Sequence, residues 1–341
     1  MLKSSFKWIF LIIGTMIGAG YASGRELWQF FGDESGLAII LFAVCFTISC
    51  FVIMSVSYQQ QSTDYVPILN IIMGRKLSRI YDILIFFYLF TTTVVMIAGS
   101  GATVQAHNYP YWAGVLVIVV LLILLFLRDI NGLLSMNQYI VPLLIAGLLY
   151  VLLSFIWAEK VPLFSYWHHQ RNWTAAFPFT ALNILPLIAV IGAIGHKIKS
   201  KGEIWITCVG SGLILGCVSY LYNSSLIEIS DEMLIYEIPL FAILKDYPFK
   251  MVIFMSILLW FAIFTTAAAG VLGIVTRVQH YINIPLWLLV TFTLVTMIPL
   301  TAFGFSTLIR YIYPVYGVLN LYVLVKLLLY PFWNKPSDAN V

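Results

Sequence analysis

The chain has 341 residues, of which 62% are hydrophobic and only 9% are charged, and its net charge is +4. Apolar runs of 18 residues or more recur from end to end, which is typical of a polytopic helical membrane protein and leaves no room for a soluble domain. No GxxxxGK[ST], HExxH or GxSxG motif and no cofactor-binding signature occurs, so neither an ATP-driven pump nor an enzyme is predicted, and the small positive charge does not indicate nucleic acid.

The first apolar stretch contains a sequence that a continuous membrane helix would avoid. Residues 13–27 read IGTMIGAGYASGREL, with glycines at 14, 18, 20 and 24 and a charged pair at Arg25 and Glu26. Glycine costs a helix about 1 kcal/mol relative to alanine, and unpaired backbone in hydrocarbon costs several kcal/mol more. We therefore expect a broken helix that borders protein or a water-filled cavity. The beginning of the chain also resembles a signal peptide, but cleavage there would start the mature protein inside an apolar pattern.

Hydropathy, with Gly, Pro and charge as boundaries, predicts ten spans. They lie near residues 6–31, 36–59, 78–104, 111–128, 132–157, 174–198, 203–222, 250–276, 284–303 and 306–331. With both ends of the chain cytoplasmic, most Lys and Arg residues fall inside and only Lys160, Arg171, Lys245 and Lys250 fall outside, as the positive-inside rule requires. We therefore expect a multi-pass protein of the plasma membrane with cytoplasmic N- and C-termini.

Five spans, an outer connection and five more spans suggest an inverted repeat. The first repeat would be residues 1–157, the extracellular connection 158–173, the second repeat 174–331, and the cytoplasmic tail 332–341. The sixth span, like the first, carries a break signal, because Asn183 precedes Pro186 and proline favours the first position of a helix. Threonines lie midway along the third span (91–93) and the eighth (265 and 266). Chance remains an alternative, since these residue types are frequent in membrane helices.

This pattern resembles the LeuT fold of the amino acid, polyamine and cation transporter superfamily, and the GAGYASGREL run resembles the YkvI-like bacterial membrane proteins. The resemblance implies an all-α 5+5 inverted repeat of ten helices, with helices 1 and 6 broken. It also implies a substrate site between those breaks, flanked by helices 3 and 8, and therefore a secondary active transporter that works by alternating access.

The resemblance also implies a sodium site. Its pattern is two carbonyls three positions apart on helix 1, and on helix 8 a carbonyl followed by two hydroxyls. The matching positions here are Gly14, Ile17, Ala262, Thr265 and Thr266. A hard cation prefers several oxygen ligands, and unwound backbone supplies free carbonyls. In the alternative reading, both threonines bond back to their own helix. Proton coupling is the rival mechanism, with Glu26 as its candidate residue.

The predicted substrate pocket is the break itself. Backbone at Gly18, Ala19, Gly20 and Tyr21, at the start of a half-helix, would attract an anionic group such as a carboxylate. Carbonyls near Asn183 would accept an ammonium group, although Asn183 also suits a helix cap. The remaining predicted pocket residues are Tyr88, Thr92, Phe179 and Phe264. With no acidic residue expected at the break, a small neutral amino acid is favoured over a polyamine or a basic amino acid.

Glu26 and Arg310 are predicted to pair as an extracellular gate, since an unpaired charge in the membrane is costly. In related symporters the basic partner is on helix 1, so the polarity here would be reversed. Two other functions stay open. The chain would be a ligand sensor if it bound a solute without coupled transport, or an organic-cation carrier if it used an aromatic cage. The expected partners are a small solute and the lipid bilayer.

Overall fold

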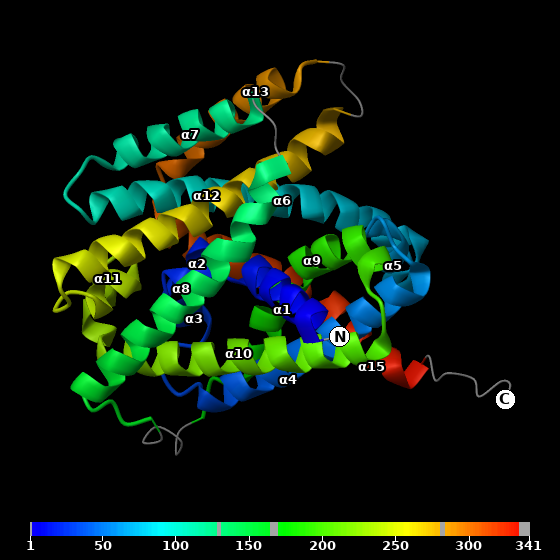
Figure 1. Ribbon diagram of the computed structural model, residues 1–341, viewed down its shortest axis with the longest axis horizontal. Coiled ribbons are helices and arrows are strands. Elements are labelled where there is room, and N and C mark those ends of the chain that lie inside the picture. Colours follow the sequence, from blue (N-terminus) through cyan, green and yellow to red (C-terminus); the bar gives the residue numbers. More distant parts are fainter. Residues whose placement is uncertain (1, 128–130, 164–169, 280–283, 334–341) are drawn as a thin grey trace, which may run out of the picture.

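The computed structural model describes residues 2–127, 131–163, 170–279 and 284–333, and every regular element in these ranges is helical (Figure 1). In chain order these are α1 (Leu2–Met16), α2 (Ala19–Ala22), α3 (Arg25–Phe30), α4 (Gly36–Gln60), α5 (Val66–Met73), α6 (Arg75–Gln105), α7 (Tyr111–Leu127), α8 (Asn131–Ala158), α9 (Ala176–Ile194), α10 (Lys201–Glu228), α11 (Pro239–Ile243), α12 (Phe249–Gln279), α13 (Leu286–Thr301), α14 (Phe305–Leu319) and α15 (Leu321–Trp333). Three 3-10 turns, η2 (Trp173–Ala175), η3 (Gly195–Lys197) and η4 (Ser230–Leu234), lie between them.

Six helices in the described ranges are long and apolar enough to cross a membrane by themselves, and α13 and α14, bent by 103°, form a seventh candidate together. Shorter apolar helices lie at Ser4–Met16, Tyr111–Leu127 and Leu321–Phe332. The chain is therefore a multi-pass membrane protein, and the count of ten spans stays a prediction. The predicted tail beyond residue 333 and residues 164–169 of the predicted connection lie outside the described residues.

The predicted tenth span is interrupted. α14 ends at Leu319 and α15 begins at Leu321, with Asn320 between them as a fully buried turn residue. The predicted span over residues 306–331 therefore consists of two helices, α14 and α15.

The long helices form two packed groups. α1, α4, α9 and α10 contact one another, and α6, α7, α12 and α13 form the second group. In Figure 1 the second group lies above the first, with α7 and α13 outermost, and α8 crosses both. α8 contacts α1, α10 and α12, while α14 and α15 contact α4, α6 and α9.

These contacts reflect the predicted repeat. In an inverted repeat each helix of the first half corresponds to one of the second half, so α8 corresponds to α14 with α15. The contacts of α8 with α1, α10 and α12 then predict contacts of α14 and α15 with α9, α4 and α6. All of these contacts are present. Two further helix pairs, α4–α10 and α6–α12, each join a helix to its own counterpart in the other half. Both pairs approach closely at a glycine, because Gly212 lies against Thr47 and Gly270 lies against Thr93. Small residues allow membrane helices this proximity.

Both described ends of the chain lie at one end of the bundle. Ser4 donates to Glu203 at the start of α10, and α15 contacts α5. In Figure 1 the α5 end is on the right and α11 is at the opposite end. Ends on one side are what an even number of spans requires, and the side of the membrane stays a prediction from the Lys and Arg distribution.

The turn between α2 and α3 depends on Gly24. Its φ of +81° is in the left-handed region, and a Cβ there would lie 2.9 Å from the Tyr222 ring of α10. The Tyr222 hydroxyl donates to the Ala22 carbonyl, 3.0 Å away, so the ring is held in place.

We expect Gly24→Ala to destabilise the protein more than Gly32→Ala. Both glycines have a positive φ, +81° and +55°, but a Cβ at Gly32 meets only the Trp28 carbonyl at an ordinary 3.8 Å. Both substitutions incur a positive-φ backbone cost of about 1–2 kcal/mol, and only Gly24→Ala adds an overpacking cost of about 1–3 kcal/mol. Thermal unfolding of the two purified variants in detergent measures the difference, and equal losses would contradict the Tyr222 contact.

Candidate functional site

Helix 1 breaks where four glycines predicted it. α1 ends at Met16, Gly18 is extended (φ −86°, ψ −171°), and its amide donates to the Met16 carbonyl at 2.9 Å instead of to Gly14. The Ile17 amide still bonds to Ile13. Within the described residues, the carbonyls of Gly14 and Ile17 accept no backbone hydrogen bond. Free carbonyl oxygens are thus concentrated at the break.

The two threonines predicted to face the break differ. The Thr266 methyl and hydroxyl groups lie 3.8 and 4.0 Å from where a Cβ at Gly18 would be, so this side chain borders the break. Thr265 instead donates to Phe261 and Ala262 of its own helix, at 3.1 and 3.2 Å. Of the predicted sodium ligands, Thr266 is therefore the hydroxyl nearest to the unwound backbone.

The carboxyl group of Glu26 lies at the break and not at the periphery. After the turn at Gly24, α3 directs this side chain back toward α2, where Glu26 Oε2 lies 2.7 Å from the Cβ position of Gly20. Glu26 is 4% exposed. The expectation that the break has no acidic residue is wrong, because sequence spacing does not reveal the chain reversal at Gly24.

Asn183 is the polar partner of Glu26. Its Nδ2 lies 3.4 Å from Glu26 Oε1 and donates to the Phe179 carbonyl at 2.9 Å. The second bond joins consecutive turns of α9, which continues through Pro186 to Ile194. The predicted break in helix 6 and the capping role of Asn183 are therefore wrong. Pro186 only removes the bond to Leu182, and the fully buried surroundings keep the helix intact.

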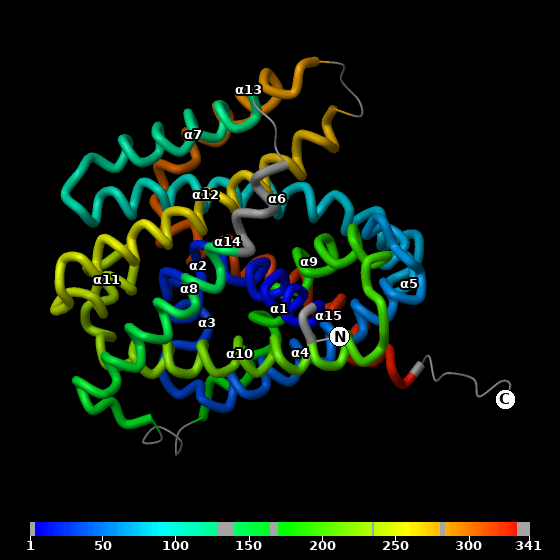
Figure 2. Tube along the Cα trace, viewed as in Figure 1, coloured from blue at the N-terminus to red at the C-terminus, as the bar shows by residue number. Residues whose placement is uncertain are grey.

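A tyrosine of α14 lies beside the Glu26 carboxyl group. Tyr313 lies 3.1 Å from the Cβ position of Gly20, which Glu26 also approaches. Tyr88 of α6 is within electrostatic range of Glu26. Figure 2 shows α14 near α2. Tyr88 is among the predicted pocket residues and Tyr313 is not, because an isolated tyrosine in an apolar helix carries no local signal.

Other predicted pocket residues have structural roles. Tyr21 points to α10, where its hydroxyl bonds to Ser219 at 2.8 Å. Phe179 packs against the rings of Phe30, Phe31 and Phe42. The Thr92 hydroxyl donates to Tyr88 of its own helix at 2.7 Å.

Phe264 also has a structural role: it stacks on Trp260, with ring centroids 5.8 Å apart.

The short length of α2 weakens the predicted anion site. α2 spans only Ala19–Ala22, so the helix dipole behind the amides of Ala19 and Gly20 is that of a single turn.

The predicted Glu26–Arg310 gate is not formed. Arg310 is exposed and lies over the Tyr311 ring, 6.0 Å from its centroid. Two charges interact with Arg25: Glu237, which precedes α11, and Arg310 itself. Burial raises the pKa of Glu237, and the Phe305 amide and Arg25 oppose that shift.

The α11 segment covers this end of the break. The Leu240 amide donates to Ser23 at 2.9 Å, and Arg25 donates to Met233 at 3.1 Å. Together with the full burial of Gly20 and Tyr21, these contacts cover the break on this side.

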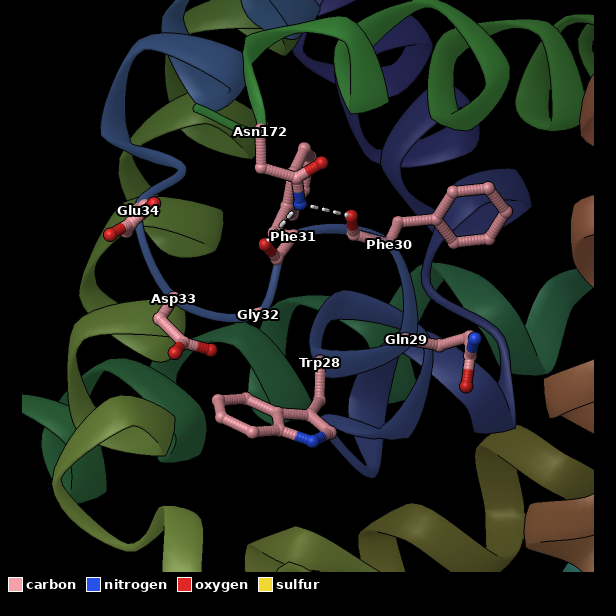
Figure 3. A pocket seen from close by; sticks show the side chains of 8 residues that line it. All are labelled: Trp28, Gln29, Phe30, Phe31, Gly32, Asp33, Glu34 and Asn172. Carbon is pink, nitrogen blue, oxygen red and sulfur yellow. Dashed lines mark hydrogen bonds between the residues drawn. The ribbon is translucent and has the colours of Figure 1, made fainter. Parts of the chain in front are cut away.

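A hollow of about 300 Å³ opens at the surface where α3 leads into α4 (Figure 3). Trp28, Asp33 and Glu34 line it, and Asn172 donates to the carbonyls of Phe30 and Phe31 at 3.0 and 2.6 Å. The rings of Phe30 and Phe31 pack on Phe179, one helical turn before Asn183. Glu26 is not among the residues that line this hollow. A second, apolar hollow lies between α6, α13 and α14, away from the break.

The chain is similar to two proteins of Bacillus subtilis (strain 168). It is 47% identical to the uncharacterized protein YyaD over 333 residues, covering 98% of both chains, and 25% identical to the uncharacterized membrane protein YkvI over 325 residues, covering 93% of both. It matches no profile of a known protein family.

Two solved structures share its fold. The inward-facing conformation of Mhp1 matches with a TM-score of 0.70 at 13% identity, over 99% of this chain and 78% of Mhp1. The manganese transporter of Eremococcus coleocola matches with a TM-score of 0.64 at 15% identity, over 99% and 81%. At these identities the likeness shows the fold alone, which is the LeuT fold.

We expect Gly20→Ala to destabilise the protein by about 1–3 kcal/mol, because the new methyl group would displace Glu26 and press on Tyr313. Gly36→Ala is the matched control, since a Cβ there meets Gln170 at an ordinary 3.5 Å. Thermal unfolding in detergent should show a clear loss for the first variant and little change for the second. Similar behaviour of both would contradict the placement of Glu26.

Proposed function

Because the chain belongs to the family of bacterial membrane proteins that includes YyaD and has the LeuT fold, we propose that it is a secondary active transporter of a small solute that carries a positively charged amine. The fold supports transport through its two packed groups of helices, with a buried candidate site at the break in helix 1. Rocking of one group against the other would expose this site alternately to the two sides of the membrane.

The Glu26 carboxyl group carries the substrate assignment. A carboxylate beside unwound backbone offers a counter-ion and carbonyl acceptors to an ammonium group, while Tyr88 and Tyr313 offer aromatic faces. Amino acids fall within this class, because their ammonium group is the part that Glu26 would hold. The prediction of a neutral amino acid over a polyamine depends on a break without an acidic residue. Because Glu26 lies at the break, that reason does not apply.

Sodium is the proposed coupling ion. The free carbonyls of Gly14 and Ile17 and the nearby Thr266 hydroxyl support it, since a hard cation takes several neutral oxygens. Ala262 and Thr265 would complete the set of ligands. The Thr265 hydroxyl donates its proton to carbonyls of its own helix, so its oxygen would still have a lone pair with which to bind sodium.

We expect a cationic solute to stabilise the wild-type protein in a thermal-shift panel of the twenty amino acids, putrescine, phenethylamine, choline and tetramethylammonium. A ligand at a hundred times its Kd stabilises by about 2.7 kcal/mol. Phenethyl alcohol and 3,3-dimethylbutanol are neutral analogues of phenethylamine and choline, and they should give no shift. Equal shifts from the neutral analogues would contradict the assigned substrate class.

Glu26→Gln should weaken the binding of the best cation about 30-fold or more, corresponding to roughly 2 kcal/mol for loss of a buried charge partner. Glu34→Gln is the matched control, because this carboxylate lies in the surface hollow (Figure 3). Calorimetric titration should find wild-type affinity in the control. Unchanged affinity in Glu26→Gln would place the amine elsewhere.

Thr266→Val should lower the apparent sodium affinity of solute binding about tenfold, through loss of one oxygen ligand of roughly 1.4 kcal/mol. Thr276→Val on the same helix is the control, because its exposed hydroxyl bonds back to Leu272. Solute binding would be titrated with sodium against a potassium background. Identical binding of wild type in both salts would eliminate sodium as the coupling ion.

A further inference from the structure

Among the described residues, no cationic side chain forms an ion pair with the Glu26 carboxyl group. The ion pairs among the described residues join Arg171 to Glu34, Lys245 to Glu232 and Arg277 to Asp82, and none of them includes Glu26. The neighbouring Arg25 directs its guanidinium to the Met233 carbonyl, away from the break. Arg310 is exposed beside Tyr311.

The groups that face Glu26 from the surrounding helices are neutral. They are Tyr88 from α6, Asn183 from α9 and Tyr313 from α14. Tyr21 of α2, also neutral, directs its hydroxyl to Ser219 of α10. On the α10 side, Tyr222 is bonded to the Ala22 carbonyl. An ionised carboxylate in such surroundings costs several kcal/mol, whereas a neutral carboxylic acid needs only ordinary hydrogen bonds.

We propose that Glu26 holds a proton when the site is empty and releases it when a cationic solute binds, so that the protein exchanges one proton for one cation. This inference rests on the proposed function and adds a second coupling ion to it. The step is balanced: the carboxylic acid and the cation become a carboxylate–cation pair and a free proton. No covalent bond changes except the O–H bond of Glu26.

This exchange explains how a buried carboxyl group can serve a transport cycle. The protonated empty site and the cation-loaded site are both neutral at Glu26, so either can be enclosed between the two helix groups. The empty ionised site carries an unpaired charge and resists enclosure. Return of the empty protein would therefore require the proton. Proton and cation compete for one carboxyl group, and each weakens the binding of the other by the same factor.

Permanent cations provide the sharpest test, because choline and tetramethylammonium have no acidic proton of their own to release. Each probe is added to purified protein in weakly buffered detergent solution containing a pH indicator, and probe binding is measured in parallel. We expect about one proton released per bound probe, and affinity that falls by up to about tenfold for each unit of decreasing pH. Glu26→Asp should retain proton release, Glu26→Gln should lose it, and Glu34→Gln should match wild type.

The outcomes separate the two proposals. Probe binding without proton release, and with affinity independent of pH, would overturn the exchange and leave the amine site intact. Binding of neutral solutes alone would overturn the proposed substrate class itself. In proteoliposomes that are acidic inside and hold equal sodium on both sides, the proton gradient should drive choline uptake, and a protonophore should abolish it. Uptake that follows only a sodium gradient would overturn proton exchange while supporting transport. The wild-type measurements need no variant, so they hold even if Glu26→Gln fails to fold.

Discussion

The approach of the Glu26 carboxyl group to Gly20 is the contact on which the candidate site depends. It requires a chain that unwinds at Gly18, reverses at Gly24 in a left-handed conformation, and has no Cβ at Gly20 to obstruct the returning side chain. Asn183 on α9 then donates a hydrogen bond to this carboxyl group. Each of these features lies within the protein, because unpaired backbone and charge are too costly to expose to lipid.

The two halves of the chain share a contact pattern, but they differ where the chemistry is. Helix 1 is divided into α1, α2 and α3, whereas its counterpart α9 is continuous through Pro186. One proline removes a single hydrogen bond, and tight packing around α9 tolerates that loss. Four glycines within eleven residues remove the packing and the helical preference together. Free backbone is therefore concentrated on helix 1, beside Thr266 and Glu26.

The fold and the site carry different kinds of information about function. YyaD is similar along nearly the whole chain, and Mhp1 and the manganese transporter share the architecture at 13% and 15% identity. What those two solved proteins carry is set by their own side chains. For this chain the substrate argument comes from one carboxyl group, one amide and two tyrosines, because sites and not folds determine specificity.

The sequence by itself determined the helical membrane class and the break in helix 1. These features follow from hydropathy and glycine content, which act over short stretches of chain. The expected pairing of that break with the threonines near residue 266 came instead from the resemblance to the LeuT fold. Only the tertiary structure decided that Glu26 returns to Gly20, that Tyr313 joins it, and that α9 stays whole. It also showed Phe179 and Tyr21 packing against neighbouring helices. The physical reason is that side-chain direction after a glycine turn depends on two backbone angles and on the helices packed around it, and a linear pattern contains neither.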